Sequence, residues 1–372
     1  MKNKYKKIGE EIFDLAGIQV NGSNPWDIQI YNEDFYERAL TEGELGVGES
    51  YMDAWWNVKN LDEFMCRILK AQLDEKIHRK YQILFQLFMV RLFYLKSKRK
   101  AFHIGEKHYD LGNNLFQHML DKRMNYSCAY WKNAKTLDEA QENKLDLICR
   151  KLFLKPGMRI LDIGCGWGAF GKFAAEKYKA EVVGLTVSKE QVELGQKLCE
   201  GLPVEFKLMD YRDMHEKFDR IVSVGMFEHV GHKNYRTFFE VSRRCLIDDG
   251  LFLLHTIGRI KPFKTIDAWT NKYIFPNAML PSTTQIGRAT ENLYVMEDWH
   301  NLGFDYDKTL MTWHRNFVQN WDQIKSQYSD RFFRMWEYYL LTCAASFRSR
   351  HTQVWQIVFS PTGIVGGYES VR

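Results

Sequence analysis

The sequence predicts an α/β protein with a doubly wound parallel sheet and a smaller mixed or helical domain at its N-terminal end. Three observations predict this fold. Helical and strand-like patterns alternate from about residue 101 onward, a short apolar run leads into three glycines spaced two apart at 164–168, and 372 residues are more than one domain of the commonest size needs.

The first part of the chain, residues 1–78, predicts the smaller domain. It contains amphipathic stretches with helical periodicity, of which residues 60–81 are an example. We expect this domain to contact lipid or a partner subunit.

Residues 79–103 predict a basic amphipathic linker. From Lys76 to Lys100 there are eight Lys or Arg and no Asp or Glu, around an apolar run at 83–95. That run is too short, and too interrupted by Gln86 and Arg91, to cross a bilayer. It predicts docking to an anionic membrane surface, and a solvated or dimer-covering helix is the alternative.

Residues 104–372 predict the domain that contains the sheet. A helix at 137–152 is broken by Pro156 and Gly157 before the first strand begins. The elements expected after it are strands at 158–164, 180–188, 204–210, 218–225 and 250–258, and helices at 169–178, 189–200 and 234–246.

Charge and cysteine usage exclude several classes of protein. A net charge of +5 is too small by itself to indicate nucleic-acid binding, so we expect no nucleic-acid partner. The N-terminus lacks the apolar segment and cleavage site of a secretion signal, which predicts a cytoplasmic protein. Seven scattered cysteines with no CxxC pair predict reduced thiols and no metal site.

The glycine turn predicts a ligand site, because ligands of such sheets lie beyond the carboxyl ends of the strands. Gly164, Gly166 and Gly168 would let the backbone approach the ligand closely, although a turn that serves packing alone is the alternative. The spacing is G-x-G-x-G, Asp162 precedes it, and Thr186 ends the second strand where a dinucleotide site usually has an acid. The first two features resemble the S-adenosylmethionine signature of class I methyltransferases.

Two polar side chains follow later strands of the same sheet. Glu228 comes after the fourth strand, and His255 lies near the end of the fifth. Strands one, four and five are neighbours in the usual methyltransferase order, so both side chains would reach the rim beside the cofactor. A helix cap for Glu228 and a core role for His255 are the alternatives.

Seven motifs, in order, resemble the cyclopropane fatty acid synthase and mycolic acid cyclopropane synthase family. The similarity covers roughly residues 101–359, and the N-terminal domain is similar to that of the bacterial phospholipid enzymes. The motifs are HYDLGNNLF, NYSCAYW, LDIGCGWG, GLTVSKEQ, FEHVG, IFPNAMLPS and DYDKTLMTW.

The resemblance implies transfer of a methylene group from S-adenosylmethionine to the cis double bond of an acyl chain in a membrane phospholipid. We also expect a homodimer that is peripherally associated with the inner face of the cell membrane. The residues that match the family's cofactor contacts are Tyr126, Ser127, Asp162, Gly164, Gly166, Trp167, Gly168, Thr186, Gln191, Asp210 and Tyr211.

The resemblance further implies a bicarbonate ion in the active site. Cys128, Glu228, His255, Ile257 and Tyr306 match the positions that bind it in the family. We expect bicarbonate to act as the base, because a permanent carboxylate close to a carbocation risks being alkylated.

Other side chains could assist the reaction. An alkene is a weak nucleophile, so alignment and aromatic stabilisation of the carbocation would help it, and packing is an equal alternative for each ring. The candidates are Tyr130, Trp131, Trp167, Phe170 and Tyr273. Cys343 is the other thiol that could be proposed for catalysis, but its small apolar neighbours favour packing.

Two other functions remain open at this point. One keeps the fold and cofactor but yields a methyl branch on a lipid, or methylates a heteroatom. The other is a non-catalytic lipid-binding protein, which we would expect to have lost at least one residue of the site.

Overall fold

The computed structural model describes residues 2–71, 73, 112–262 and 266–372. These residues divide into two compact units. The first unit draws on Met1–Met119, Ile266–Asn277 and Leu310–His351, and the second on Leu120–Thr265, Ala278–Thr309 and Thr352–Arg372. The predicted linker at 79–103 lies outside the described residues, so its structure stays a prediction. Two later segments, 266–277 and 310–351, belong with the N-terminal unit although the sequence analysis placed them in the sheet domain.

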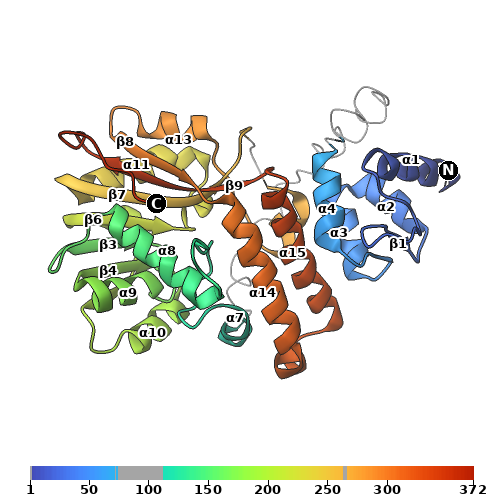
Figure 1. Ribbon diagram of the computed structural model, residues 1–372, viewed down its shortest axis with the longest axis horizontal. Helices are drawn as coiled ribbons and strands as arrows, with labels where there is room; N and C mark the ends of the chain where they lie inside the picture. The colour runs from blue at the N-terminus through green and yellow to red at the C-terminus, as the bar shows by residue number, and fades with distance from the viewer. Residues whose placement is uncertain (1, 72, 74–111, 263–265) are drawn as a thin grey trace. The chain divides into compact units, whose positions relative to one another are not determined.

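The second unit is built on a seven-stranded sheet in the order β5-β4-β3-β6-β7-β9-β8. The five predicted strands are confirmed and run parallel, and Figure 1 shows β4, β3, β6 and β7 side by side. Their bounds are β3 Arg159–Ile163, β4 Glu181–Thr186, β5 Val204–Leu208, β6 Phe218–Val224 and β7 Leu246–Gly258. Two further strands, β8 (Val295–Asn301) and β9 (Gln353–Ser360), join antiparallel beyond β7.

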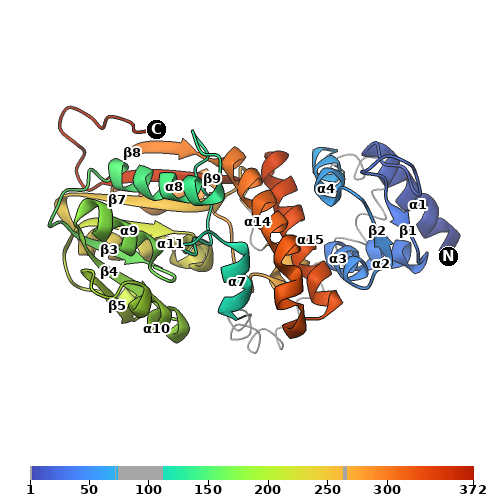
Figure 2. The same cartoon turned by 60° about the horizontal axis from the view of Figure 1, so that its bottom comes forward.

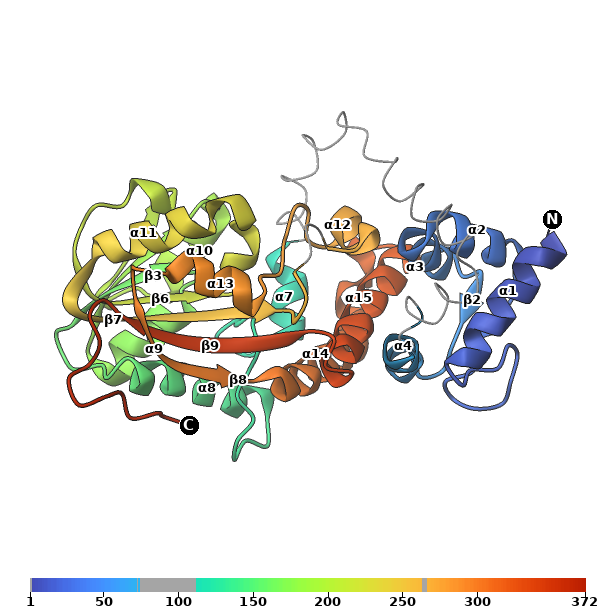
Figure 3. The ribbon, with the colours of Figure 1, turned by 90° about the horizontal axis from the view of Figure 1, so that it is seen from above.

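Helices cover both faces of this sheet, which makes it doubly wound as predicted. The helices α8 (Leu137–Lys151) and α9 (Ala169–Tyr178) lie on one side, while α11 (Tyr235–Cys245) and α13 (Thr283–Thr290) lie on the other (Figure 3). α10 (Lys189–Leu198) packs beside β5 at the end of the sheet (Figure 2). Short 3-10 turns are η2 Tyr211–Asp213, η3 Phe227–His229 and η4 His232–Asn234.

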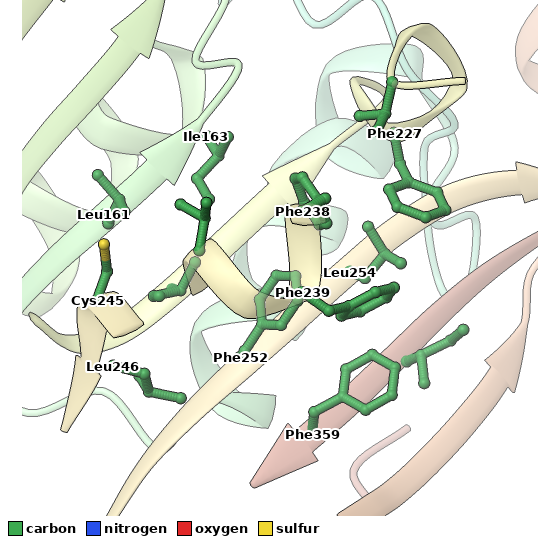
Figure 4. Packing of buried hydrophobic residues seen from close by; sticks show 14 of the residues in the cluster. Leu161, Ile163, Phe227, Phe238, Phe239, Cys245, Leu246, Phe252, Leu254 and Phe359 are labelled. Atoms are coloured by element: carbon green, nitrogen blue, oxygen red, sulfur yellow. The ribbon is translucent and has the colours of Figure 1, made fainter. Parts of the chain in front are cut away.

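A buried aromatic cluster holds the second face together. Phe227 stacks on Tyr235 with ring centroids 4.3 Å apart and also contacts Phe238 and Phe239 of α11. Figure 4 shows Phe227, Phe238, Phe239, Phe252 and Phe359 gathered between α11 and the strands. Because Phe227 is completely buried, it fixes the short η3 turn that carries Glu228.

The start of α8 is set by its own sequence. Thr136 and Glu139 form a capping box, in which the Thr136 hydroxyl accepts from the Glu139 amide and the Glu139 carboxylate accepts from the Thr136 amide. This arrangement satisfies amides at the helix end that lack a partner within the helix. α8 is thereby placed in register to deliver Gln141, Lys144 and Lys151 to the interior.

The first unit is mainly helical. α15 packs against α3 and α4, and β1 pairs with β2 in a two-residue ladder. Its elements are α1 Lys2–Leu15, β1 Gln29–Ile30, α2 Asp34–Glu42, α3 Glu44–Met52, β2 Trp56–Asn57, α4 Leu61–Lys70, α7 Asn113–Met119, α12 Ala268–Tyr273, η5 Lys325–Gln327 and α15 Asp330–Arg348. The chain passes from the second unit into the first within α14, Gly303–Ile324.

Among the described helices, none combines the length and apolar character that crossing a bilayer requires.

Candidate active site

The predicted glycine turn connects β3 to α9. Gly164, Gly166 and Gly168 all have positive φ, of 85°, 56° and 86°. The amides of Gly164 and Cys165 both donate to the Leu185 carbonyl of β4, at 3.0 Å each. A side chain at Gly164 would meet Met226, since a Cβ there would lie 2.6 Å from the Met226 Cβ. Gly164 therefore needs to be glycine for both its backbone angle and its surroundings.

The ends of β4 and β5 present further predicted cofactor residues. Thr186 donates its hydroxyl to the Gln191 side-chain oxygen at 2.6 Å, while Ser188 caps α10. The Met209 amide donates to the Thr186 carbonyl, which places Asp210 just beyond the neighbouring strand end. Asp210 pairs with Arg212, whose guanidinium holds the pKa of that carboxyl below its usual range.

A buried polar cluster joins the segment before the sheet to α8. Lys144 donates to the Asn125 side-chain oxygen at 2.8 Å and to the Ser127 hydroxyl at 3.1 Å, and Gln141 donates to the Ser127 carbonyl at 2.9 Å. These contacts fix the backbone on both sides of Tyr126. Lys144 and Gln141 were not predicted as part of the site, because lysine and glutamine on a helix are usually exposed.

Asp162 lies completely inside the protein near the end of β3. Burial raises the pKa of its carboxyl to about 7, and the nearby Lys144 ammonium offsets part of that shift. Burial in turn lowers the pKa of Lys144 to about 8. Each charge limits the cost of burying the other.

Glu228 is buried on η3 and bound on one side only. Its Oε1 accepts from the Ile257 amide at 2.6 Å, whereas its Oε2 has no hydrogen-bond partner among the residues that the structure describes. Burial raises the pKa of Glu228 to about 7. The contact with Ile257 joins two of the predicted site residues directly.

Cys128 is connected to Ile257 by a series of contacts through Leu302 and Val354. Its thiol donates to the Leu302 carbonyl at 3.8 Å, and the Leu302 amide donates to the Val354 carbonyl at 2.8 Å. Val354 is the β9 partner of Ile257. Burial raises the pKa of the Cys128 thiol well above its usual range, so it stays protonated.

The residues just after Leu302 begin α14 and include Tyr306, which is buried. Thr309 of the same helix accepts from the Ala129 amide at 3.2 Å and from the Trp131 indole at 2.9 Å. Asp305 accepts from the Trp131 amide at 3.0 Å. The segment that carries Cys128 is therefore docked on the first two turns of the helix that carries Tyr306.

His255 lies on β7 two residues before Ile257, in register with Val224 at the end of β6. Its ring is buried, and Nε2 has no partner within the described part of the chain. Burial is the main cause that lowers the pKa of His255 to about 3, and Lys144, Lys151 and His300 contribute to it. The ring is therefore neutral at physiological pH.

Two of the residues considered for catalysis belong to the first unit. Tyr273 lies in the first unit, where it donates its hydroxyl to Glu49 at 2.8 Å, and Cys343 lies on α15 in the same unit. Burial raises the pKa of Cys343 to about 12, which agrees with a packing role.

The other aromatic candidates lie in the second unit. Phe170 packs in the apolar cluster of α8 and α9. The Lys308 ammonium lies 4.2 Å from the centre of the Trp131 ring.

No group of three or more His, Cys, Asp or Glu side chains within residues 2–71, 112–262 and 266–372 is arranged to hold a metal ion.

Comparison with known proteins shows the family to which the chain belongs. Residues 96–357 match the family model of mycolic acid cyclopropane synthetase. The chain is 52% identical over 370 residues to a cyclopropane-fatty-acyl-phospholipid synthase of Escherichia coli K12, covering 100% of this chain and 97% of that protein. It is 38% identical over 273 residues to cyclopropane mycolic acid synthase 3 of Mycobacterium tuberculosis H37Rv, covering 68% and 95% respectively.

Solved structures agree with this similarity. A cyclopropane synthase of M. tuberculosis superposes with a TM-score of 0.64 at 33% identity, covering 68% of this chain and 95% of that one. A mycolic acid cyclopropane synthase in complex with SAH and CTAB gives the same TM-score, 0.64, at 36% identity, with 68% and 95% covered. The predicted methyltransferase fold is confirmed.

Proposed function

Because this chain belongs to the mycolic acid cyclopropane synthetase family, and is thus an S-adenosylmethionine-dependent methyltransferase-class enzyme, we propose that it forms cyclopropane rings on unsaturated acyl chains of membrane phospholipids. The identity of 52% extends over both the N-terminal region and the sheet. The mycobacterial relative, in contrast, matches only 68% of the chain. This difference supports a phospholipid substrate over a mycolic acid.

The strand ends of the second unit would hold S-adenosylmethionine, which supplies the methyl group. The glycine turn brings the backbone close to the ligand, and Thr186 with Gln191 presents polar groups suited to the ribose hydroxyls. Asp210, Tyr211, Asp162 and Trp167 complete the proposed cofactor contacts together with Tyr126 and Ser127. Gln141 and Lys144 keep Ser127 in place through hydrogen bonds to its carbonyl and its hydroxyl.

The observation that carries the proposed mechanism is a pair of buried polar atoms without partners. Glu228 Oε2 and His255 Nε2 are both buried and unpartnered within the described residues, and Glu228 accepts from the amide of Ile257, which follows His255 by two residues on β7. A buried polar atom without a partner costs roughly 1–3 kcal/mol, so this part of the site is suited to a small polar ligand. Bicarbonate fits it, and when bound it would supply the base that takes the proton released on ring closure.

The protein side chains position the ion and do not serve as bases themselves. The low pKa of His255 keeps its ring neutral, and the high pKa of Cys128 keeps its thiol protonated. With a pKa of about 7, Glu228 is partly protonated near neutral pH and can then donate a hydrogen bond to an anion. Tyr306 would supply another hydroxyl from α14.

A direct assay tests the proposed reaction. Purified protein, S-adenosylmethionine and unsaturated phospholipid vesicles are mixed, and the acyl chains are analysed by mass spectrometry. We expect a gain of one CH2 unit in a product that resists hydrogenation. A product of the same mass that takes up hydrogen would indicate a methyl branch with a double bond, and would refute ring formation.

The Glu228→Ala variant tests the proposed anion site. We expect it to abolish product while S-adenosylmethionine still binds in calorimetry, because the change removes the buried carboxyl next to Ile257 but leaves the glycine turn intact. The exposed Glu205 on β5 provides a control, and Glu205→Ala should keep full activity. Turnover by Glu228→Ala would contradict the proposed role.

We also propose that the enzyme is a homodimer, and that it associates with the cytoplasmic face of the membrane through the basic segment 76–100. The eight positive residues of that segment support this second proposal. Sedimentation analysis and vesicle binding test the two proposals separately.

A further inference from the structure

Gln356 of β9 is a buried amide beside His255 that the sequence analysis did not identify. Val224, His255, Gln356 and His300 are successive register partners across β6, β7, β9 and β8. Directly opposed residues in neighbouring strands point to the same face of a sheet, so these side chains form one row. Gln356 is completely buried within it.

The contact between Gln356 and His255 involves defined atoms. Gln356 Nε2 lies 3.3 Å from His255 Nδ1. With its nitrogen on the ring side, the Gln356 amide donates to Nδ1, which then accepts and carries no proton. The Gln356 Oε1 is buried and has no partner among the described residues. In a neutral imidazole the proton then resides on Nε2.

We propose that Gln356 is a positioning residue that holds His255 in the Nε2–H form, so that the ring presents a hydrogen-bond donor to the anion bound in the active site. The part of this inference that concerns the anion rests on the proposed function. The part that concerns the proton on the ring does not.

The surroundings of the row explain why a neutral amide stands at this position. Lys151 of α8 lies 3.1 Å from His300 Nδ1 at the far end, and the same lysine pairs with Asp298 at 3.3 Å. Burial, with smaller contributions from Lys144, Lys151 and His300, lowers the pKa of His255 to about 3 and so disfavours a positive charge on the ring. A neutral ring has two alternative proton positions, and a neighbouring donor selects between them without adding a charge.

The selected form suits the chemistry of the site. His255 Nε2 has no partner among the described residues, and Glu228 Oε2 is likewise unpartnered. A donor at Nε2 matches an oxygen of bicarbonate, whereas a lone pair there would repel it.

Nitrogen-15 NMR of histidine-labelled protein tests the proton position directly. We expect the His255 signals, identified by their loss in His255→Gln, to show a protonated Nε2 and an unprotonated Nδ1. Replacement Gln356→Met keeps the length of the side chain but removes the donor, so we expect a measurable population of the Nδ1–H form. A wild-type ring protonated on Nδ1, or a pattern unchanged by Gln356→Met, would overturn the proposal.

Kinetics of the same variants test the consequence for the anion. Loss of one buried hydrogen bond predicts that Gln356→Met raises the bicarbonate concentration for half-maximal activity about fivefold to tenfold. The KM for S-adenosylmethionine should not change, which separates positioning from general damage. Gln323→Met, at an exposed glutamine of α14, serves as the control.

The two parts of the inference fail in different ways. Wild-type activity that does not depend on bicarbonate would refute the anion of the proposed function, while the NMR pattern would still decide the role of Gln356. An unchanged bicarbonate dependence in Gln356→Met, together with a changed NMR pattern, would refute the link between the two.

Discussion

Glu228 shows how strongly burial alters a single side chain in this protein. Its carboxyl is bound by one backbone amide and shielded from water, which raises its pKa to about 7. The raised pKa means that the folded protein holds this proton more tightly than the unfolded chain. The contribution of the group to stability is therefore complete below the ordinary pKa of 4.5 and is lost as the pH rises through about 7.

The Glu228→Gln variant should accordingly be more stable than the wild type at alkaline pH. Gln keeps an oxygen for the Ile257 amide but has no proton to lose. The difference in free energy of unfolding between the variant and the wild type should therefore grow between pH 4.5 and 7, to at most roughly 3 kcal/mol. Urea unfolding at about pH 5 and about pH 8.5 measures the difference. The same difference in unfolding free energy at both pH values would mean that this carboxyl titrates as if it were exposed.

At the scale of elements, the turn between β3 and α9 depends on more than backbone flexibility. Gly164 and Gly157 both have positive φ, 85° and 79°, yet their surroundings differ. A Cβ at Gly164 would lie 2.6 Å from Met226, whereas a Cβ at Gly157 would meet nothing within 4 Å. Met226 immediately precedes η3, so the turn also touches the segment that carries Glu228.

Replacement of each glycine by alanine separates the two effects. Gly157→Ala should lower the free energy of unfolding by about 1–2 kcal/mol, because of the backbone angle alone. Gly164→Ala should lower it by about 1–3 kcal/mol more, because the new Cβ would collide with Met226. We expect only Gly164→Ala to weaken S-adenosylmethionine binding. Urea midpoints and titration calorimetry measure both effects, and equal losses in the two variants would contradict the role of the contact.

At the scale of the whole molecule, charge is distributed unevenly along the chain. The net charge is +5, and the basic segment 76–100 has eight positive residues and no acid to balance them. Each Lys or Arg near an anionic membrane contributes about 1 kcal/mol of attraction at low salt. The acyl chains proposed as substrate would lie within a bilayer, so such attraction would raise the concentration of enzyme near them.

Reversal of Lys96, Lys98, Arg99 and Lys100 to Glu should therefore weaken binding to anionic vesicles by at least about tenfold at low salt. Reversal of Lys155, Lys177, Lys179 and Lys197, which are exposed in the second unit, makes the same change in net charge elsewhere and is the control. Co-sedimentation measures binding. An equal loss in both variants would point to net charge alone, and would count against docking by the basic segment.

The parallel part of the sheet, the glycine turn and the family could be predicted from the amino-acid sequence. Alternating helical and strand patterns are local, and motifs such as LDIGCGWG keep their spacing along the chain. The two antiparallel strands β8 and β9 were not predicted, and neither was the assignment of residues 266–277 and 310–351 to the N-terminal unit.

The residues that support the site from distant parts of the chain could be identified only in the folded protein. Gln356 reaches His255 across 101 residues of chain because β9 returns antiparallel beside β7, and Lys144 reaches Ser127 from the buried side of α8. Neither residue stands out in the sequence, since glutamine and lysine are usually exposed. Burial changes their role, because most polar atoms inside a protein are hydrogen-bonded, and the packing of the chain determines which partner each one finds.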